Sequence, residues 1–146
     1  MNIYNDLEFF QNYDNTTENT VFSNLDYTQT HFYIESSDMQ SIHLSAIQKY
    51  LNDYKKPTML GEFGIGHSGT DTRQKDPNGI HLHNSLWASA VSGAFGSSLT
   101  WWWDSYVHPM NLYHNFRPIS LFIGQLDLLE EDFVSRSVEG ITDERS

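Results

Sequence analysis

One carboxylate in the sequence occupies a position that favours a catalytic role. Glu62 lies in the run LGEFG (60–64), which is otherwise apolar and has a glycine before and after the charge. A charged group in such a run is costly to bury unless it is paired or functional, and glycine lets another group approach the backbone closely. Glu62 is therefore the first candidate for catalysis. The alternative is a strand-end glutamate that faces water or caps the next helix.

Two further polar residues, His31 and Tyr33, stand about 30 positions before Glu62 in the sequence. His31 and Tyr33 alternate in the run THFY (30–33), so they share one face of the strand expected there. Tyr33 could donate a hydrogen bond that orients an ionised Glu62. His31 could hydrogen-bond a ligand or tune an acid, and otherwise it is an ordinary strand histidine with its polar atoms satisfied.

Three consecutive tryptophans form the third candidate group. By strand alternation Trp101 and Trp103 point to one side and Trp102 to the other. An indole ring can stack on the C–H face of a sugar, which makes Trp103, and less directly Trp101, candidates for substrate binding. Core packing is the alternative for all three.

The elements that position these residues alternate between strand and helix. β-branched and aromatic runs predict strands, and apolar residues at helical spacing predict helices. The expected strands cover residues 27–34, 58–65 and 97–103, and the expected helices cover residues 41–54, 80–95 and 117–126. Such alternation is typical of a parallel sheet. The spacing from His31 to Glu62 is close to the roughly 30 residues of one barrel unit, although a doubly wound sheet has a similar rhythm.

Two details of these elements are open to test. The apolar face expected for the first helix consists of Ile42, Leu44, Ile47, Tyr50 and Leu51. Residues 66–79 are expected as a loop, whose charges Asp71, Arg73 and Asp76 are either solvated or serve outer sugar subsites.

Composition restricts the partners and cofactors. The chain has 146 residues with 8 Lys or Arg against 19 Asp or Glu, a formal net charge of −11, which disfavours nucleic acid and anionic membranes and is compatible with a neutral polysaccharide. No run approaches the length of a membrane span. With no cysteine, thiolate metal sites are excluded. His81 and His83 do not share a helix face, and Gly64-x-Gly66 is no nucleotide fingerprint, so no cofactor is expected.

The runs THFY, GEFG and WWWD together resemble the last three strands of the cellulase-like retaining glycoside hydrolases, the family 5-like group of the (β/α)8-barrel superfamily. The resemblance covers roughly residues 25–128, and GEFG is its most specific part. It implies hydrolysis of a β-linked glycan with Glu62 as nucleophile, with His31 and Tyr33 after the sixth strand and Trp103 under the sugar at the cleavage point. Retaining hydrolysis also needs a second carboxylate about 5 Å away.

The sequence departs from this family in one respect. The family's acid–base glutamate follows an asparagine, and no Asn-Glu pair occurs in the chain. We therefore expect an α/β fold that forms the C-terminal three βα units of a (β/α)8 TIM barrel, inactive alone and prone to associate with itself or with the missing N-terminal portion. The expected parts are a polar segment over 1–25, the partial barrel over 26–128 and an acidic tail over 129–146.

Two questions stay open at this point. The rival to an enzyme is a non-catalytic, carbohydrate-binding or decayed partial barrel. The start of the chain shows no signal peptide, and if the chain is part of a longer one its compartment is undecided.

Overall fold

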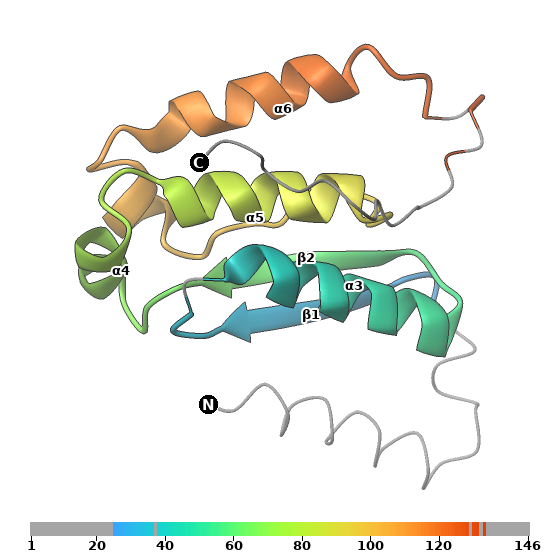
Figure 1. The fold of residues 1–146 in the computed structure, drawn as a ribbon, viewed down its shortest axis with the longest axis horizontal. Coiled ribbons are helices and arrows are strands. Elements are labelled where there is room, and N and C mark those ends of the chain that lie inside the picture. The colour runs from blue at the N-terminus through green and yellow to red at the C-terminus, as the bar shows by residue number, and fades with distance from the viewer. Residues whose placement is uncertain (1–24, 37, 129, 132, 134–146) are drawn as a thin grey trace, which may run out of the picture.

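The computed structural model describes residues 25–36, 38–128, 130, 131 and 133. These residues form a mixed α/β fold with a small parallel sheet, which confirms the expected fold class at this level (Figure 1). The elements follow in the order β1 (Thr28–Tyr33), α3 (Met39–Tyr54), β2 (Thr58–Gly64), α4 (Gly69–Lys75), α5 (Ile80–Val91), a π-helix (Trp103–Val107), a 3-10 helix (Leu112–Asn115) and α6 (Phe116–Ile123). Most of the segments expected over 1–25 and 129–146 lie outside the described residues.

The sheet consists of β1 and β2, which run parallel and are joined by α3. Thr28, Thr30 and Phe32 of β1 are buried, while the residues between them are exposed. This period of two means that β1 has one covered face and one open face. Both strands point toward the side of the molecule where α4 lies, on the left in Figure 1.

A β-bulge sets which face of β2 carries the charge. The register between the strands shifts by one residue after Leu60, so that Gly61 is extra and Glu62 pairs with His31. In a regular strand Leu60 and Glu62 would share a face. With the bulge, Leu60 and Phe63 are both buried under the helices, and Glu62 lies beside His31 on the open face.

The regular strand expected over 97–103 is wrong. This segment lies parallel to β2 for a short distance only, with one bridge between Phe63 and Thr100. The Phe63 N–H donates to the Leu99 carbonyl at 2.9 Å. The sheet therefore has two strands and a third neighbour reduced to a bridge.

The departure from the sheet is accompanied by a contact with a distant segment. Beyond Trp101 the indole N–H of Trp102 donates to the carbonyl of Gly66 at 3.1 Å. This bond draws Trp102 across the end of β2, and the chain then enters the π-helix Trp103–Val107. The aromatic run thus leaves the strand geometry in which alternate side chains point to opposite faces.

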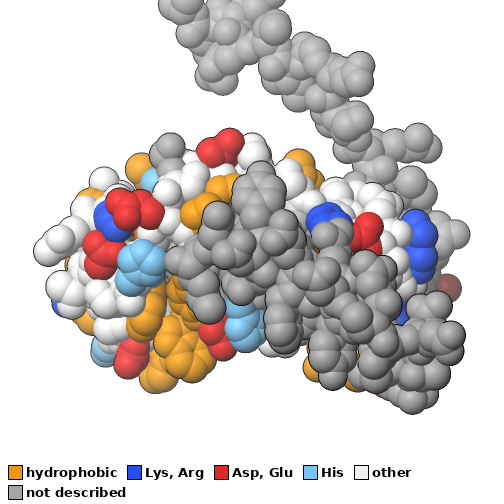
Figure 2. Space-filling view, turned by 90° about the horizontal axis from the view of Figure 1, so that it is seen from below, with side chains coloured by type: hydrophobic (Ala, Val, Ile, Leu, Met, Phe, Trp, Pro, Cys, Tyr) orange, Lys and Arg blue, Asp and Glu red, His pale blue; other side chains and the backbone are white. Residues whose placement is uncertain are grey.

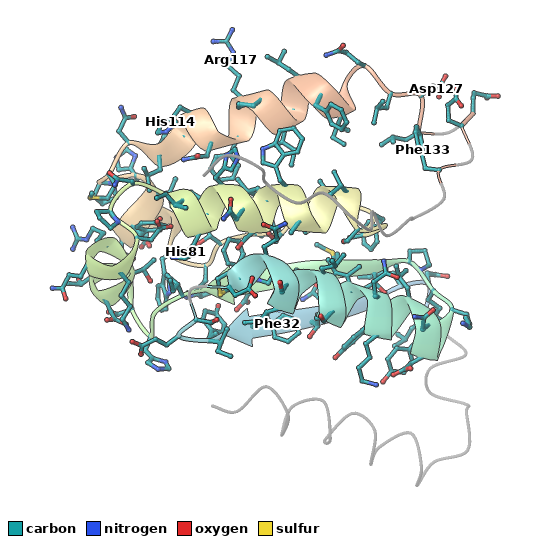
Figure 3. All side chains as sticks on the ribbon, in the orientation of Figure 1. Phe32, His81, His114, Arg117, Asp127 and Phe133 are labelled. Carbon is teal, nitrogen blue, oxygen red and sulfur yellow. The ribbon has the colours of Figure 1, made fainter. Side chains whose placement is uncertain are left out.

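The helices α3 and α5 lie on the same face of the sheet and pack against each other (Figure 1). His43 of α3 is fully buried between the rings of Phe32 and Phe63, at centroid distances of 6.3 and 5.0 Å. On the other side of α5, Trp87 contacts Phe122 of α6 at a centroid distance of 5.4 Å. Figure 3 shows Phe32 at the sheet and Arg117 projecting from α6 away from α5.

Several expected boundaries and faces need correction. The first helix forms as α3, but Leu44 is 44% exposed, and the buried face is Met39, His43, Ala46, Ile47 and Tyr50. The helix expected over 80–95 ends at Val91, before Gly93 with its φ of 93°, a conformation that glycine adopts at little cost. The last helix is Phe116–Ile123 rather than 117–126.

The loop expected over 66–79 contains α4, which begins where Ser68 accepts a hydrogen bond from the Asp71 N–H at 3.1 Å. At the end of α4, Asp76 is 3% exposed and is not a solvated loop charge. Its carboxylate accepts the N–H of Ile80 at 2.7 Å and of Leu82 at 3.1 Å. The hydroxyl of Tyr106 donates to it at 2.7 Å. Asp76 therefore ties the start of α5 to the π-helix.

Candidate functional site

Three of the residues expected from the sequence to act in catalysis meet on the open face of the sheet. Glu62 of β2 is the register partner of His31 on β1, and Tyr33 is the last residue of β1. The side chain of Glu62 is 26% exposed and that of His31 is 42% exposed. This cluster of Glu62, Tyr33 and His31 is called the Glu62 cluster below.

Tyr33 holds one oxygen of the carboxylate. Its hydroxyl donates to Glu62 Oε2 at 2.5 Å. Burial, followed by the hydrogen bond to Glu62 and the negative charge of Glu62, raises the pKa of Tyr33 far above its ordinary value. The phenol therefore stays protonated and remains a donor throughout the pH range in which a protein works.

His31 approaches the same oxygen from the neighbouring strand. Its Nδ1 lies 3.4 Å from Glu62 Oε2. Its other ring nitrogen, Nε2, lies 2.6 Å from the amide nitrogen of Gln29. Within the described part of the chain, both polar contacts of Glu62 are made through Oε2. Oε1 has no polar contact with any of the described residues.

The two glycines beside Glu62 make room for its neighbours. A Cβ at position 61 would lie 2.5 Å from the side-chain nitrogen of Gln29, and a Cβ at position 64 would lie 2.7 Å from the indole nitrogen of Trp102. Any larger residue at either position would displace the side chain that lies across it. The glycines expected to permit close approach therefore do so here, toward Gln29 and Trp102.

The tryptophans are arranged differently from the expectation. Trp101 and Trp103 are 52% and 63% exposed, and neither makes a described ring contact with the Glu62 cluster. Trp102 does: its ring meets the edge of Tyr33 at a centroid distance of 6.1 Å. Trp102 is also partly buried against the main hydrophobic cluster, so it serves both packing and the site.

Sequence reasoning missed two residues at the site, Gln29 and Trp102. Gln29 precedes His31 by two positions, and strand alternation alone places it on the same face. Trp102 had no comparable signal, because its position depends on the turn out of the sheet. Seen from below the orientation of Figure 1, hydrophobic, histidine and acidic side chains adjoin on the described surface (Figure 2).

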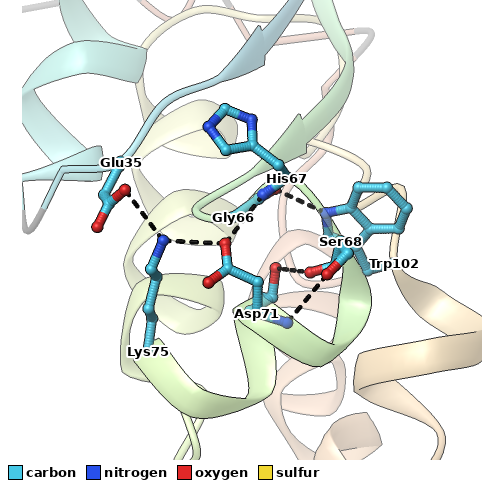
Figure 4. Close-up of polar contacts among 8 residues, drawn as sticks. Glu35, Gly66, His67, Ser68, Asp71, Lys75 and Trp102 are labelled. Atoms are coloured by element: carbon cyan, nitrogen blue, oxygen red, sulfur yellow. Dashed lines mark hydrogen bonds and ion pairs between the residues drawn. The ribbon is translucent and has the colours of Figure 1, made fainter.

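A network of charges joins α4 to the segment that follows β1 (Figure 4). The ammonium of Lys75 lies 3.0 Å from Glu35 Oε2 and 2.9 Å from Asp71 Oδ2. The hydrogen bond with Asp71, and to a lesser extent that with Glu35, raises the pKa of Lys75. The hydrogen bond between Asp71 and Lys75 in turn lowers the pKa of Asp71. The carboxylate of Glu35, which follows β1, is therefore paired with Lys75 and not with the Glu62 cluster.

Among the described residues, no three His, Asp or Glu side chains come together to hold a metal ion. Nor does any helix in this part of the chain have the length and apolar character needed to cross a bilayer. Comparisons with known protein families, with curated proteins and with solved structures find no match to this chain. The geometry of the Glu62 cluster, and the chemistry that this geometry permits, are therefore the basis for assigning a function.

Proposed function

We propose that this chain is part of a retaining β-glycoside hydrolase in which Glu62 is the nucleophile that attacks the anomeric carbon of a β-linked glycan. The observation that carries the proposal is the Glu62 cluster itself. One carboxylate oxygen is held by Tyr33 at 2.5 Å and approached by His31 at 3.4 Å, while the other has no partner among the described residues. A nucleophile needs this combination of fixed orientation and one free oxygen.

The arrangement of helices supports a (β/α)8 barrel as the scaffold. β1, β2 and the segment around Thr100 follow one another in chain order, and α3 and α5 both cover one face of the sheet. Consecutive units of a barrel have this arrangement, and so does one half of a doubly wound sheet, whose other half has its helices on the opposite face. The Glu62 cluster lies on the face opposite α3 and α5, toward the carboxyl ends of the strands, which is where barrel enzymes bind substrate.

Retaining hydrolysis requires a second carboxylate as acid and base. Glu35 follows β1, but its side chain is paired with Lys75, and the sequence contains no Asn-Glu pair. We assign only the nucleophile to this chain. In the complete enzyme, the acid–base group comes from another part of the barrel, and without it the chain does not turn over ordinary glycosides.

The nucleophile can be tested without the acid. A dinitrophenyl fluorosugar β-glycoside has a leaving group that departs unprotonated, and the fluorine beside the anomeric carbon slows hydrolysis of the glycosyl-enzyme. We expect intact-mass spectrometry to detect one fluorosugar per chain, and peptide mapping to place it on Glu62. Glu62→Gln should abolish labelling because an amide is not a nucleophile.

The matched control is Glu35→Gln, which removes a carboxylate that is already paired with Lys75. It should label at the wild-type rate. Absence of label, or label spread over surface carboxylates in wild type and Glu62→Gln alike, would contradict the assignment of Glu62 as nucleophile.

A second candidate function is carbohydrate binding without hydrolysis. The observation in its favour is the exposure of Trp101 and Trp103, at 52% and 63%, since exposed indole rings offer faces for stacking on sugars. Affinity electrophoresis in soluble β-glucans tests it. Retardation that Trp103→Ala removes, together with no fluorosugar label on Glu62, would favour the binding module.

A further inference from the structure

We propose that Gln29 is a positioning residue that holds His31 in the neutral tautomer with its proton on Nδ1, so that the imidazole presents an N–H to Glu62. The inference rests on the proposed function for its catalytic consequence, although the tautomer itself is a property of the free protein. Three residues on the open face take part: Gln29 and His31 on β1, and Glu62 on β2.

The first step is the contact between Gln29 and His31. The amide nitrogen of Gln29 lies 2.6 Å from Nε2 of His31. An amide NH₂ group only donates hydrogen bonds. At this distance Nε2 must therefore be the acceptor, and in a neutral imidazole the proton then resides on Nδ1.

The second step is the contact on the other side of the ring. Nδ1 lies 3.4 Å from Oε2 of Glu62. A lone pair on Nδ1 would repel the carboxylate, whereas an N–H is attracted to it. Gln29 and Glu62 thus select the same tautomer from opposite sides of one ring, as the second partner of an imidazole commonly does.

Gly61 leaves the space that allows Gln29 to lie in this position. Gly61 is the extra residue of the bulge, and a Cβ there would lie 2.5 Å from the Gln29 nitrogen and closer still to its amide carbon. The side chain of Gln29 therefore lies across the only residue type that leaves room for it. The bulge that turns Glu62 to the open face therefore also leaves the space in which the Gln29 side chain lies.

The consequence is a nucleophile that is held by one donor, Tyr33, and faced by a second N–H. Oε2 of Glu62 faces the hydroxyl of Tyr33 and the Nδ1–H of His31, so the carboxylate is oriented with Oε1 outward. A proton on Nε2 instead would leave Oε2 facing a lone pair, and the carboxylate would be free to rotate.

The test is the tautomer of His31, read from two-dimensional ¹H–¹⁵N spectra that correlate ring protons with both ring nitrogens, with His31→Gln assigning the signals. At pH 8, above the usual titration range of an imidazole, we expect Nδ1 in the protonated range and Nε2 in the unprotonated range. Gln29→Glu should reverse the state of Nε2, because a carboxylate accepts a hydrogen bond and cannot donate one. The matched control Gln40→Glu makes the same change on the exposed surface of α3 and should leave the His31 signals unchanged.

A second variant keeps Gln29 and moves it. Gly61→Ala should displace the Gln29 side chain and produce a loss of the Nδ1–H tautomer, with an unchanged midpoint of thermal unfolding because only a flexible side chain gives way. A protonated Nε2 in the wild type, or a tautomer that neither Gln29→Glu nor Gly61→Ala alters, would overturn the inference.

The two proposals fail separately. If His31 has the expected tautomer but the fluorosugar does not label Glu62, the positioning by Gln29 stands and the hydrolase assignment falls. If Glu62 is labelled while Nε2 carries the proton, the hydrolase assignment stands and the role of Gln29 falls.

Discussion

Two tyrosine–carboxylate pairs in this chain can be compared directly. Tyr33 donates to Glu62 at 2.5 Å, and Tyr106 donates to Asp76 at 2.7 Å. In both pairs burial, the hydrogen bond and the charge of the carboxylate raise the pKa of the tyrosine, in that order. Both phenols are therefore permanent donors, and the pairs differ in what surrounds the carboxylate.

Asp76 is 3% exposed and accepts two backbone N–H groups at the start of α5 as well as the phenol. The side chain of Glu62 is 26% exposed, and among the described residues it is contacted by side chains alone, through Oε2. A carboxylate whose oxygens are occupied by the backbone is a structural anchor, whereas one with a free oxygen can act on a ligand. The same pair of residue types thus serves stability at α5 and, under the proposed function, chemistry on the sheet.

The largest effect that we expect from this contrast is on stability at Asp76. Asp76→Ala leaves two backbone donors and a buried phenol without their acceptor, and should lower the free energy of unfolding by about 3 kcal/mol or more. Glu62→Ala should change it by about 0.5 kcal/mol or less, as for most partly exposed positions. Urea denaturation of both variants measures the difference. Equal losses would remove the distinction between anchor and site.

The buried histidine on the covered side of the sheet should make the free energy of unfolding depend on pH, by an amount similar to that expected for Asp76→Ala. Burial of His43, which the Ser85 backbone only partly offsets, lowers its pKa to about 4 from the ordinary 6.5. Because the unfolded chain binds this proton at higher pH than the folded one, the contribution of His43 is complete above pH 6.5 and is lost as the pH falls toward 4. The loss should total about 3 kcal/mol.

His43→Leu isolates this contribution, since leucine does not titrate. The fall in unfolding free energy between pH 6.5 and 4 should be smaller in His43→Leu than in wild type. His83→Leu, an exposed position of α5, should keep the wild-type slope. A wild-type slope in both variants would show that His43 is not the group responsible.

The sequence was sufficient for what depends on local periodicity. Strand-forming runs predict β1 and β2, and helical spacing predicts α3 and α5, so His31, Tyr33 and Glu62 are correctly placed on strands. That β1 and β2 are parallel neighbours follows from their connection through a helix. The meeting of Tyr33 with Glu62 is the part of the site that could be predicted in advance.

What could not be predicted depends on contacts between distant segments. Gly61 becomes a bulge because Leu60 and Phe63 both pack under the helices, and no local pattern reveals that. His43 takes a core position that an apolar-face count assigns to Leu44. The sequence around Asp76 is that of an ordinary loop charge, and the hydroxyl that buries it belongs to Tyr106, thirty residues later in the chain.

The tyrosines give a finer test of the comparison than the carboxylates. Tyr106→Phe removes a donor from a buried charge and should cost about 1.5–2 kcal/mol. Tyr33→Phe removes a donor from a carboxylate that water can reach, and should cost about 0.5 kcal/mol or less. Thermal unfolding of the two variants, with fluorosugar labelling of Tyr33→Phe, separates the roles. Slower labelling of Glu62 with unchanged stability is the result expected for Tyr33.

The smallest effect should come from two carboxylates that water reaches, Asp71 in α4 and Glu35 after β1. Lys75→Met removes the partner of Asp71 and Glu35, and exposed ion pairs contribute little. The ion pair stabilises the fold only where Asp71 is ionised and Lys75 is protonated. Its contribution to stability is therefore lost as the pH falls through the lowered pKa of Asp71, and again as the pH rises through the raised pKa of Lys75. In 1 M salt, where charges are screened over about 3 Å, wild type and Lys75→Met should unfold at the same temperature. A large, salt-resistant loss would instead place this network with Asp76, as an anchor that fixes the loops around Glu62.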